Sequence, residues 1–324
     1  MAGEVVKVGP AGEVALARLA DKAREYIGCS RSENTLRAYR GDWRHFCAWC
    51  EGRGLVAMPA APETVALYLA DHAEGEGALS VGTLQRRLAS IAVAHQAAGH
   101  DDPTKGAAVK NVWKGIRRAK GTAPKGKAPV LTADLRRMVE ELPEGILGTR
   151  DRALLLLGFA GGFRRSELVG LDRADVAITV EGAVVTIRRS KTDQEGEGRK
   201  VGIPYGSNPD TCPVRALAAW VDAAGIEDGP LFRPVNRHGQ VGAGRLSGYA
   251  VALVVKRYAE KAGLDAARYA GHSLRAGLAT SAANAGASER SIMAQTGHRS
   301  AAMVRRYIRD GSLFRENAAA TVGL

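Results

Sequence analysis

A long stretch without a single acidic side chain, from Pro103 to Ala133, divides the sequence. Four residues in its second half interrupt regular structure: Gly121, Pro124, Gly126 and Pro129. Because 324 residues exceed one typical domain, we interpret residues 120–131 as a basic linker between two domains. A run of like charge is usually a solvated surface. Between two basic domains, however, it favours a path along a nucleic-acid backbone.

The sequence before the linker predicts an all-helical domain over residues 31–119, preceded by a leader at residues 1–30. The leader itself favours one helix from Glu13 to Tyr26. Ser32 or Asn34 is expected to cap the first helix of the domain. Apolar residues then recur at helical spacing in four segments: Leu36–Cys50, Pro62–Leu69, Ser80–Ala98 and Pro103–Ile116.

Two cysteines of this domain form a C-x-x-C pair. Such a pair, here Cys47 and Cys50, can bind zinc or take part in redox chemistry. Both cysteines continue an apolar stripe, and no second Cys or His pair lies nearby at ligand spacing. We therefore assign both to the core. His95 also ends an apolar stripe, and we expect a core or boundary histidine there.

Residues 132–311 predict a mainly helical domain that carries a small antiparallel sheet. Thr132 is expected to cap its first helix, and Asp151–Phe159 is almost uniformly apolar, which favours a central buried helix. Alternating residues predict three short strands, at Val176–Val180, Ala183–Arg189 and Arg199–Pro204. Further helices are expected over Pro213–Ala224, over Leu246–Ala262 and, as short Ala-rich segments, from His272 onward.

The charge balance indicates the class of partner. A net charge of +12 and an isoelectric point near 9.8 point to a polyanion, most simply nucleic acid, with a generic basic protein as the alternative. No apolar run approaches the roughly eighteen residues of a membrane span, and the N-terminus lacks a signal-peptide core. Four cysteines in a chain of this length do not indicate a disulfide framework. We therefore expect a cytoplasmic protein with no membrane partner.

Side chains suited to phosphate chemistry gather near the C-terminus: His272, Arg275, His298 and Tyr307. The first two are three residues apart, so on a helix they share one face. A guanidinium fork clamps a phosphate, and an imidazole donates to its oxygens or moves protons. A phenol can be a covalent nucleophile. Upstream, Gly162–Leu168 offers a second arginine, and Ser190–Thr192 offers a lysine between two predicted strands.

The order Arg, Lys, His-x-x-Arg, Gly-His, Tyr resembles the active site of the tyrosine recombinases, also called phage-type integrases. The resemblance extends over nearly the whole chain and is strongest to the Cre-like members. It implies their fold, an all-helical core-binding domain followed by a mainly helical catalytic domain with a small antiparallel sheet. It also implies a site-specific DNA recombinase that forms a 3′-phosphotyrosine and a free 5′-hydroxyl, with no cofactor and no metal.

The resemblance also implies a role for each residue of the motif. Tyr307 is the nucleophile, Lys191 the general acid for the leaving 5′ oxygen, and Arg164 and Arg275 clamp the phosphate. The neighbouring Arg165 is excluded, because the family's arginine directly follows Gly-x. His272 and His298 divide proton removal and phosphate binding in an order that the sequence does not decide. Glu167 either orients the site or caps a helix.

Residues for DNA recognition are expected in the first domain. The resemblance places five residues on helices that face DNA, with the last three pointing outward from their helix: Arg37, Arg40, Gln85, Arg86 and Arg87. Arginine and glutamine read base edges in a major groove, and phosphate contacts or plain surface charges are the alternatives. The basic run adds Arg117, Arg118 and Lys120.

The implied partner is double-stranded DNA with inverted-repeat half-sites, bound by a homotetramer. Residues 312–324 include Leu313, Phe314 and Val322, and we expect this segment to dock on the next protomer. Packing on its own domain is the alternative. Two other functions stay open at this point: relaxation of DNA in the manner of a type IB topoisomerase, and a DNA-binding regulator without catalysis.

Overall fold

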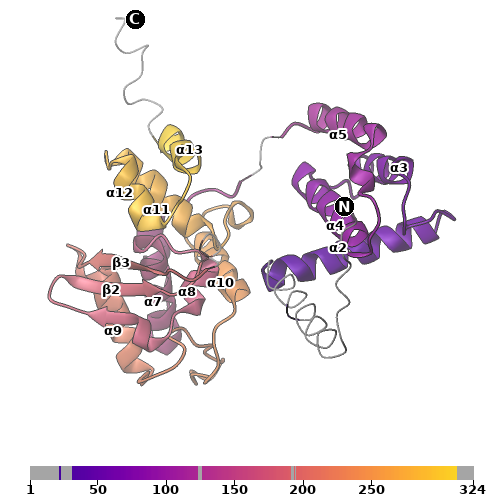
Figure 1. Ribbon diagram of the computed structural model, residues 1–324. Coiled ribbons are helices and arrows are strands. Elements are labelled where there is room, and N and C mark those ends of the chain that lie inside the picture. Colours follow the sequence, from indigo (N-terminus) through magenta and orange to yellow (C-terminus); the bar gives the residue numbers. More distant parts are fainter. Residues whose placement is uncertain (1–21, 23–30, 123–125, 191–192, 194, 312–324) are drawn as a thin grey trace, which may run out of the picture. The chain divides into compact units, whose positions relative to one another are not determined.

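The computed structural model describes residues 22, 31–122, 126–190, 193 and 195–311, and Figure 1 shows the chain. It divides into two compact units between Lys125 and Gly126, inside the predicted linker. Three predictions lie outside the described residues: the helix Glu13–Tyr26 apart from Lys22, the lysine at 191, and the segment 312–324. Within the described ranges, no helix combines the length and the apolar character needed to cross a membrane.

The N-terminal unit is built from four α-helices among its described residues: α2 (Glu33–Glu51), α3 (Pro62–Ala73), α4 (Val81–Ala97) and α5 (Ala107–Lys120). Ser32 accepts a hydrogen bond from the Thr35 N–H and so caps α2, and Ser80 caps α4 in the same way. The apolar stripes of these helices meet in one core, in which Phe46, Tyr68 and Leu84 have no exposed surface.

The assignments of Cys50 and His95 to the interior of this unit are confirmed. Cys50 is fully buried and Cys47 is half-buried. His95 has no exposed surface, and its Nε2 atom accepts a hydrogen bond of 2.9 Å from the Ala60 N–H. Its Nδ1 atom lies 2.8 Å from the Ile91 carbonyl oxygen, which can only accept. His95 is therefore a neutral core residue whose two ring nitrogens are both satisfied.

The C-terminal unit contains one antiparallel sheet in the order β1 (Val176–Ile178), β2 (Gly182–Ile187), β3 (Arg199–Pro204). Val185 of β2 pairs with Val176 on one side and with Val201 on the other, and all three are buried. All three strands were predicted. β1 ends two residues early, because Val180 is 97 % exposed in the turn and has no sheet partner.

Helices supply the rest of this unit: α6 (Thr132–Glu140), α7 (Ile146–Ala160), α8 (Arg165–Gly170), α9 (Pro213–Ala223) and α10 (Gly248–Lys261). The apolar run of α7 is buried as predicted, and α9 packs along it. Thr132 is the first residue of α6 and not its cap. The Leu131 N–H at the cap position is instead satisfied by Asp134, at 3.4 Å.

Three C-terminal helices complete the unit and lie together in Figure 1: α11 (Ser273–Asn284), α12 (Glu289–Thr296) and α13 (Ala301–Gly311). The segment before α6 runs across α11, where the Val130 N–H donates to the Ser273 carbonyl. A Cβ atom at Gly277 would lie 1.8 Å from the Val130 carbonyl oxygen. Glycine at this position therefore permits the close approach that fixes α11, the helix that carries the His-x-x-Arg motif.

Candidate active site

Tyr307 and His272 come from helices that pack against each other, α13 and the start of α11. The His272 Nε2 atom lies 3.1 Å from the Tyr307 hydroxyl oxygen, within the reach that a general base needs. Val304, three residues before the tyrosine, is fully buried in a small cluster that includes Ile292 of α12. This packing holds the half-buried phenol beside the imidazole.

Arg275 follows His272 by one turn of α11 and has no exposed surface. Its Nη1 atom donates to the carbonyl oxygens of Gly162, at 2.8 Å, and of Thr296. Its Nε and Nη2 atoms are buried and form no hydrogen bond with any described residue. Burial, followed by the positive charge of Arg164, lowers the pKa of Arg275 to about 10, so the guanidinium stays charged at neutral pH.

These two N–H groups of Arg275 lie on one edge of the planar guanidinium. A buried donor without an acceptor costs free energy, so native proteins rarely keep one without a function. The edge formed by Nε and Nη2 has the geometry that binds two oxygens of a phosphate or carboxylate side by side. The arrangement therefore suits an anionic ligand.

Arg164 and Glu167 are joined at the N-terminus of α8. The Arg164 backbone N–H donates to Glu167 Oε2 at 3.0 Å, and Arg164 Nη1 donates to Oε1 at 2.5 Å. The Glu167 side chain is 1 % exposed. Both roles that the sequence left open for Glu167 thus occur together, because one carboxylate caps α8 and orients the arginine. The excluded Arg165 is exposed and lies against Gly248 and Gly271.

A third arginine of this site was missed by the sequence analysis. Arg199 begins β3, and its Nη2 atom lies 3.7 Å from Glu167 Oε2. The same guanidinium donates to the carbonyl oxygens of Gln295 and Thr296, at 3.1 and 3.4 Å. Burial lowers the pKa of Arg199. Its position directly after the predicted lysine-bearing hairpin was the only signal that the sequence offered.

His298 lies between these cations and the tyrosine. Its ring centroid is 5.9 Å from that of Tyr307, and its Nδ1 atom lies 2.6 Å from the Thr296 hydroxyl oxygen. Burial, followed by the charges of Arg275 and Arg164, lowers the pKa of His298 to about 4. The imidazole is therefore neutral at pH 7. Of the seven predicted catalytic residues, the structure brings together all except Lys191, which lies outside the described residues.

The residues predicted to contact DNA differ in exposure. Seven are exposed: Arg37, Arg40, Gln85, Arg86, Arg117, Arg118 and Lys120. The Lys120 ammonium donates to the Ala73 carbonyl at 2.6 Å and so contacts its own unit. The prediction that Arg87 points outward is wrong. Its side chain is 11 % exposed and donates to the Tyr68 hydroxyl at 2.7 Å, because Asp42 and Tyr68 form a polar pocket beneath it.

Comparison with known proteins identifies the family. The profile of the Phage integrase family matches residues 130–312, which is more than half of the chain, and that of the Phage integrase N-terminal SAM-like domain matches residues 25–101. This chain belongs to the phage integrase family. The predicted family is therefore confirmed, and with it the enzyme class: the chain is a tyrosine recombinase, a DNA strand transferase that cuts and rejoins DNA.

Individual relatives agree with this assignment. The integrase/recombinase XerD homolog of Selenomonas ruminantium is 43 % identical over 305 residues, covering 93 % of this chain and 89 % of that protein. Recombinase Cre of Escherichia phage P1 is 26 % identical over 298 residues, covering 86 % and 84 %.

Solved structures show the same fold. The XerH site-specific recombinase bound to its palindromic difH substrate matches with a TM-score of 0.59 at 19 % identity, over 80 % of this chain and 72 % of that one. A lambda integrase dimer bound to a COC′ core site matches with a TM-score of 0.58 at 17 % identity, over 96 % and 83 %. The predicted fold class is confirmed.

Proposed function

We propose that this tyrosine recombinase cleaves DNA by attack of the Tyr307 hydroxyl oxygen on a backbone phosphodiester. The phenolic proton passes to His272 Nε2, the new bond joins the tyrosine oxygen to phosphorus, and the bond to the 5′ oxygen breaks. Lys191 supplies a proton to that leaving oxygen. A 5′-hydroxyl from another strand then reverses the reaction and joins the new partner.

Charge on the phosphorane is stabilised by side chains. Arg164 and Arg275 bind its non-bridging oxygens, and His298 donates to one of them. Such preorganised donors are typically worth about a hundredfold to a thousandfold each in rate. We propose that neither metal ion nor nucleotide cofactor takes part. Cleavage should then proceed at the same rate in EDTA, and strict dependence on Mg²⁺ or Zn²⁺ would contradict the mechanism.

The observation that carries this proposal is the 3.1 Å approach of His272 Nε2 to the Tyr307 hydroxyl, beside the buried donor edge of Arg275. The test is trapping on a nicked suicide substrate, which keeps the covalent adduct from religating. Tyr307→Phe removes only the hydroxyl, so it should bind the half-site with unchanged affinity and form no adduct. Tyr258→Phe, a buried tyrosine away from the motif, is the control that should retain adduct formation. Undiminished adduct in Tyr307→Phe would mean that another residue is the nucleophile.

We also propose that the exposed residues of the N-terminal unit bind double-stranded DNA: Arg37, Arg40, Gln85, Arg86, Arg117 and Arg118. Their exposure supports this role, as do the net charge of +12 and the DNA complexes of the XerH and lambda structures. Lys120 is a weaker candidate because its ammonium already binds Ala73. Arg87 is withdrawn from the set.

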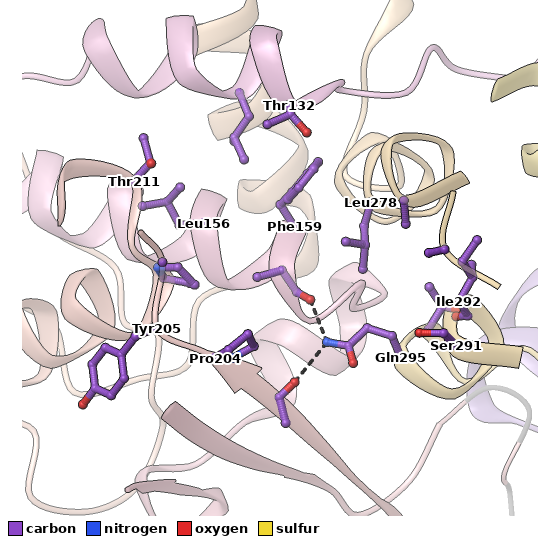
Figure 2. Close-up of a pocket in the computed structure, with 18 of the residues that line it drawn as sticks. Thr132, Leu156, Phe159, Pro204, Tyr205, Thr211, Leu278, Ser291, Ile292 and Gln295 are labelled. Atoms are coloured by element: carbon purple, nitrogen blue, oxygen red, sulfur yellow. Dashed lines mark hydrogen bonds between the residues drawn. The ribbon is translucent and has the colours of Figure 1, made fainter. Parts of the chain in front are cut away.

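Finally, we propose that four copies assemble on two inverted-repeat sites, each docking its segment 312–324 on the next catalytic unit. A groove of about 490 Å³ supports this idea. Figure 2 shows it, lined by apolar side chains that include Leu156, Phe159, Leu278 and Ile292. Its floor includes Gln295, whose amide donates to the carbonyls of Ala160 and Gly202, at 2.8 and 3.2 Å. Leu313, Phe314 and Val322 are apolar residues of matching character.

The test is truncation after Gly311, paired with a blocked groove. Ala287 is exposed and lines the groove, whereas Ala285 is exposed nearby and does not. The truncated chain and Ala287→Glu should bind one half-site normally and lose cooperative assembly on the full site. Ala285→Glu should behave as the unsubstituted protein. Tetrameric synapses formed by the truncated chain at the full-length rate would exclude docking in trans.

A further inference from the structure

Thr296 connects three groups of the proposed active site, although the sequence motif does not include it. The residue ends α12 and has no exposed surface. Its carbonyl accepts hydrogen bonds from Arg275 and Arg199, and its hydroxyl contacts His298.

The carbonyl side of this arrangement follows from how α12 ends. Gly297 adopts a left-handed conformation with φ of 66°, which terminates the helix and leaves its last carbonyls without intrahelical donors. Two arginines supply the missing donors. A Cβ atom at Gly297 would lie 2.6 Å from Arg199 Nε, so glycine is needed here for the turn and for the approach of the guanidinium.

The contacts of the Thr296 hydroxyl determine which ring nitrogen of neutral His298 carries the proton. The Thr296 Oγ1 atom is 2.6 Å from the Ile292 carbonyl oxygen and 2.6 Å from His298 Nδ1. A carbonyl can only accept, so the hydroxyl proton must point to Ile292 to avoid two oxygens meeting without a proton between them. Oγ1 then has only lone pairs left for the imidazole. The Nδ1 atom of His298 must therefore carry a proton and donate it to Oγ1.

We propose that Thr296 is a positioning residue that holds neutral His298 in the Nδ1–H tautomer, so that Nε2 is an acceptor until the ring gains a second proton. His298 then donates from Nε2 to a phosphate oxygen only as an imidazolium, and DNA binding is coupled to uptake of one proton from solvent. This second step rests on the proposed phosphodiester chemistry, whereas the tautomer does not.

The surroundings of His298 favour this order of events. The charged and titratable groups that face it from neighbouring elements are Arg275 and His272 of α11, Arg164 before α8, Arg199 of β3 and Tyr307 of α13. Most of these groups are cations, so in the protein without DNA they disfavour a positive charge on the His298 ring. A bound phosphate places negative charge beside the same groups and therefore favours protonation of His298. The contact of Thr296 with Ile292 alone would be ordinary back-bonding at a helix end, but the bond to His298 gives it a chemical consequence.

The decisive measurement is the ¹⁵N spectrum of the histidine rings in the full chain without DNA, where protonated and unprotonated ring nitrogens are distinct. The signal of His298 is assigned by its loss in His298→Gln. At pH 7 we expect Nδ1 protonated and Nε2 unprotonated. Thr296→Val keeps the shape and removes the hydroxyl, so it should shift the population toward the Nε2–H tautomer, and Thr296→Ser should restore the original signal. An Nε2–H ring in the unsubstituted protein, or a tautomer that Thr296→Val does not change, would overturn the proposal.

A second readout concerns the reaction. Loss of one buried hydrogen-bond partner should slow single-turnover cleavage by Thr296→Val about tenfold and change its pH dependence, while Thr296→Ser stays near the unsubstituted rate. Equal far-ultraviolet circular dichroism spectra of all three proteins control for folding. An unchanged pH profile in Thr296→Val would contradict the coupling. If the unsubstituted protein formed no adduct, the proposed function would fail, yet the tautomer measurement would still decide the role of Thr296.

Discussion

Arg86 and Arg87 of the N-terminal unit and Arg275 of the catalytic unit are held in opposite ways. In the N-terminal unit, Arg86 donates to both oxygens of Asp42, at 2.7 and 3.0 Å, and Arg87 Nε lies 3.8 Å from the same carboxylate. In the catalytic unit, Arg275 is bonded only to neutral carbonyls among the described residues and keeps one edge of its guanidinium unbonded. Arg87 also has a buried Nε without a hydrogen bond, but a carboxylate stands beside it.

The difference separates a structural arginine from one prepared for a ligand. Asp42 neutralises the Arg86 guanidinium and occupies two of its donors, so this pair contributes to the fold and little to recognition of an anion. Carbonyl groups fix the orientation of the guanidinium without cancelling its charge. Arg164 and Arg199 share the Glu167 carboxylate, and Arg275 forms no ion pair with it, so the surplus positive charge lies where we place the phosphate.

Arg275→Gln is the strongest challenge to this comparison. It removes the charge and the donor edge together, so single-turnover cleavage of a suicide substrate should fall about a hundredfold to a thousandfold. Stability should change little, because the loss of an unpaired buried charge offsets the loss of the hydrogen bonds to the carbonyls of Gly162 and Thr296. Arg268→Gln, at an exposed position in the same unit, is the control. Cleavage near the unsubstituted rate would show that the clamp lies elsewhere.

Asp42→Asn tests the other half of the comparison. It keeps the shape and leaves two arginines without their counter-charge, so the free energy of unfolding of the N-terminal unit should fall by about 3 kcal/mol. Trp43, Trp49 and Trp113 lie in this unit, so denaturant unfolding followed by tryptophan fluorescence reports on it.

The control for Asp42→Asn is Glu33→Gln, which breaks the exposed 3.5 Å ion pair with Arg37 and should leave stability unchanged. Equal stability of Asp42→Asn and the unsubstituted protein would mean that Arg86 and Arg87 are not structural.

Much of this architecture could be predicted because its signals are local. Apolar periodicity predicted all three strands and the helices of both units except the short α8, since burial of one face repeats along a single segment. The His-x-x-Arg spacing placed His272 and Arg275 on one face of a helix. These features depend on residues that are neighbours in the chain.

The rest depended on contacts between distant segments. Arg87 turns inward because Asp42 of α2 and Tyr68 of α3 meet beneath α4, which no pattern within α4 indicates. Arg199 and Thr296 belong to the site because β3 passes the end of α12, where carbonyls lack helical donors. Every residue carries a backbone carbonyl, so residue type does not indicate which carbonyls will accept hydrogen bonds from these arginines.

Burial of His298 beside the surplus positive charge of the catalytic unit also predicts a dependence of stability on pH. The pKa of His298 is about 4 in the folded chain and 6.5 in the ordinary case. Between these values the unfolded chain binds more protons, so stability should fall as the pH falls from 6.5 to 4, by up to about 3 kcal/mol. His298→Gln should lose this part of the acid sensitivity. Unfolding free energies at pH 7 and pH 4.5 measure it, and an equal loss in both proteins would contradict the assignment.

The smallest expected effect distinguishes two exposed arginines of the proposed DNA surface. Arg40 pairs with no carboxylate among the described residues, whereas the charge of Arg86 is already neutralised by Asp42. The logarithm of the half-site binding constant falls with the logarithm of salt concentration, with a slope of about 0.9 per neutralised phosphate. Arg40→Ala should therefore reduce the slope by about 0.9 if this residue binds one phosphate. Arg86→Ala should leave it nearly unchanged, because Arg86 can contact a phosphate only by giving up its bonds to Asp42. Equal slope changes in the two variants would show that DNA displaces the carboxylate, and the contrast between paired and unpaired arginines would then not extend to the bound state.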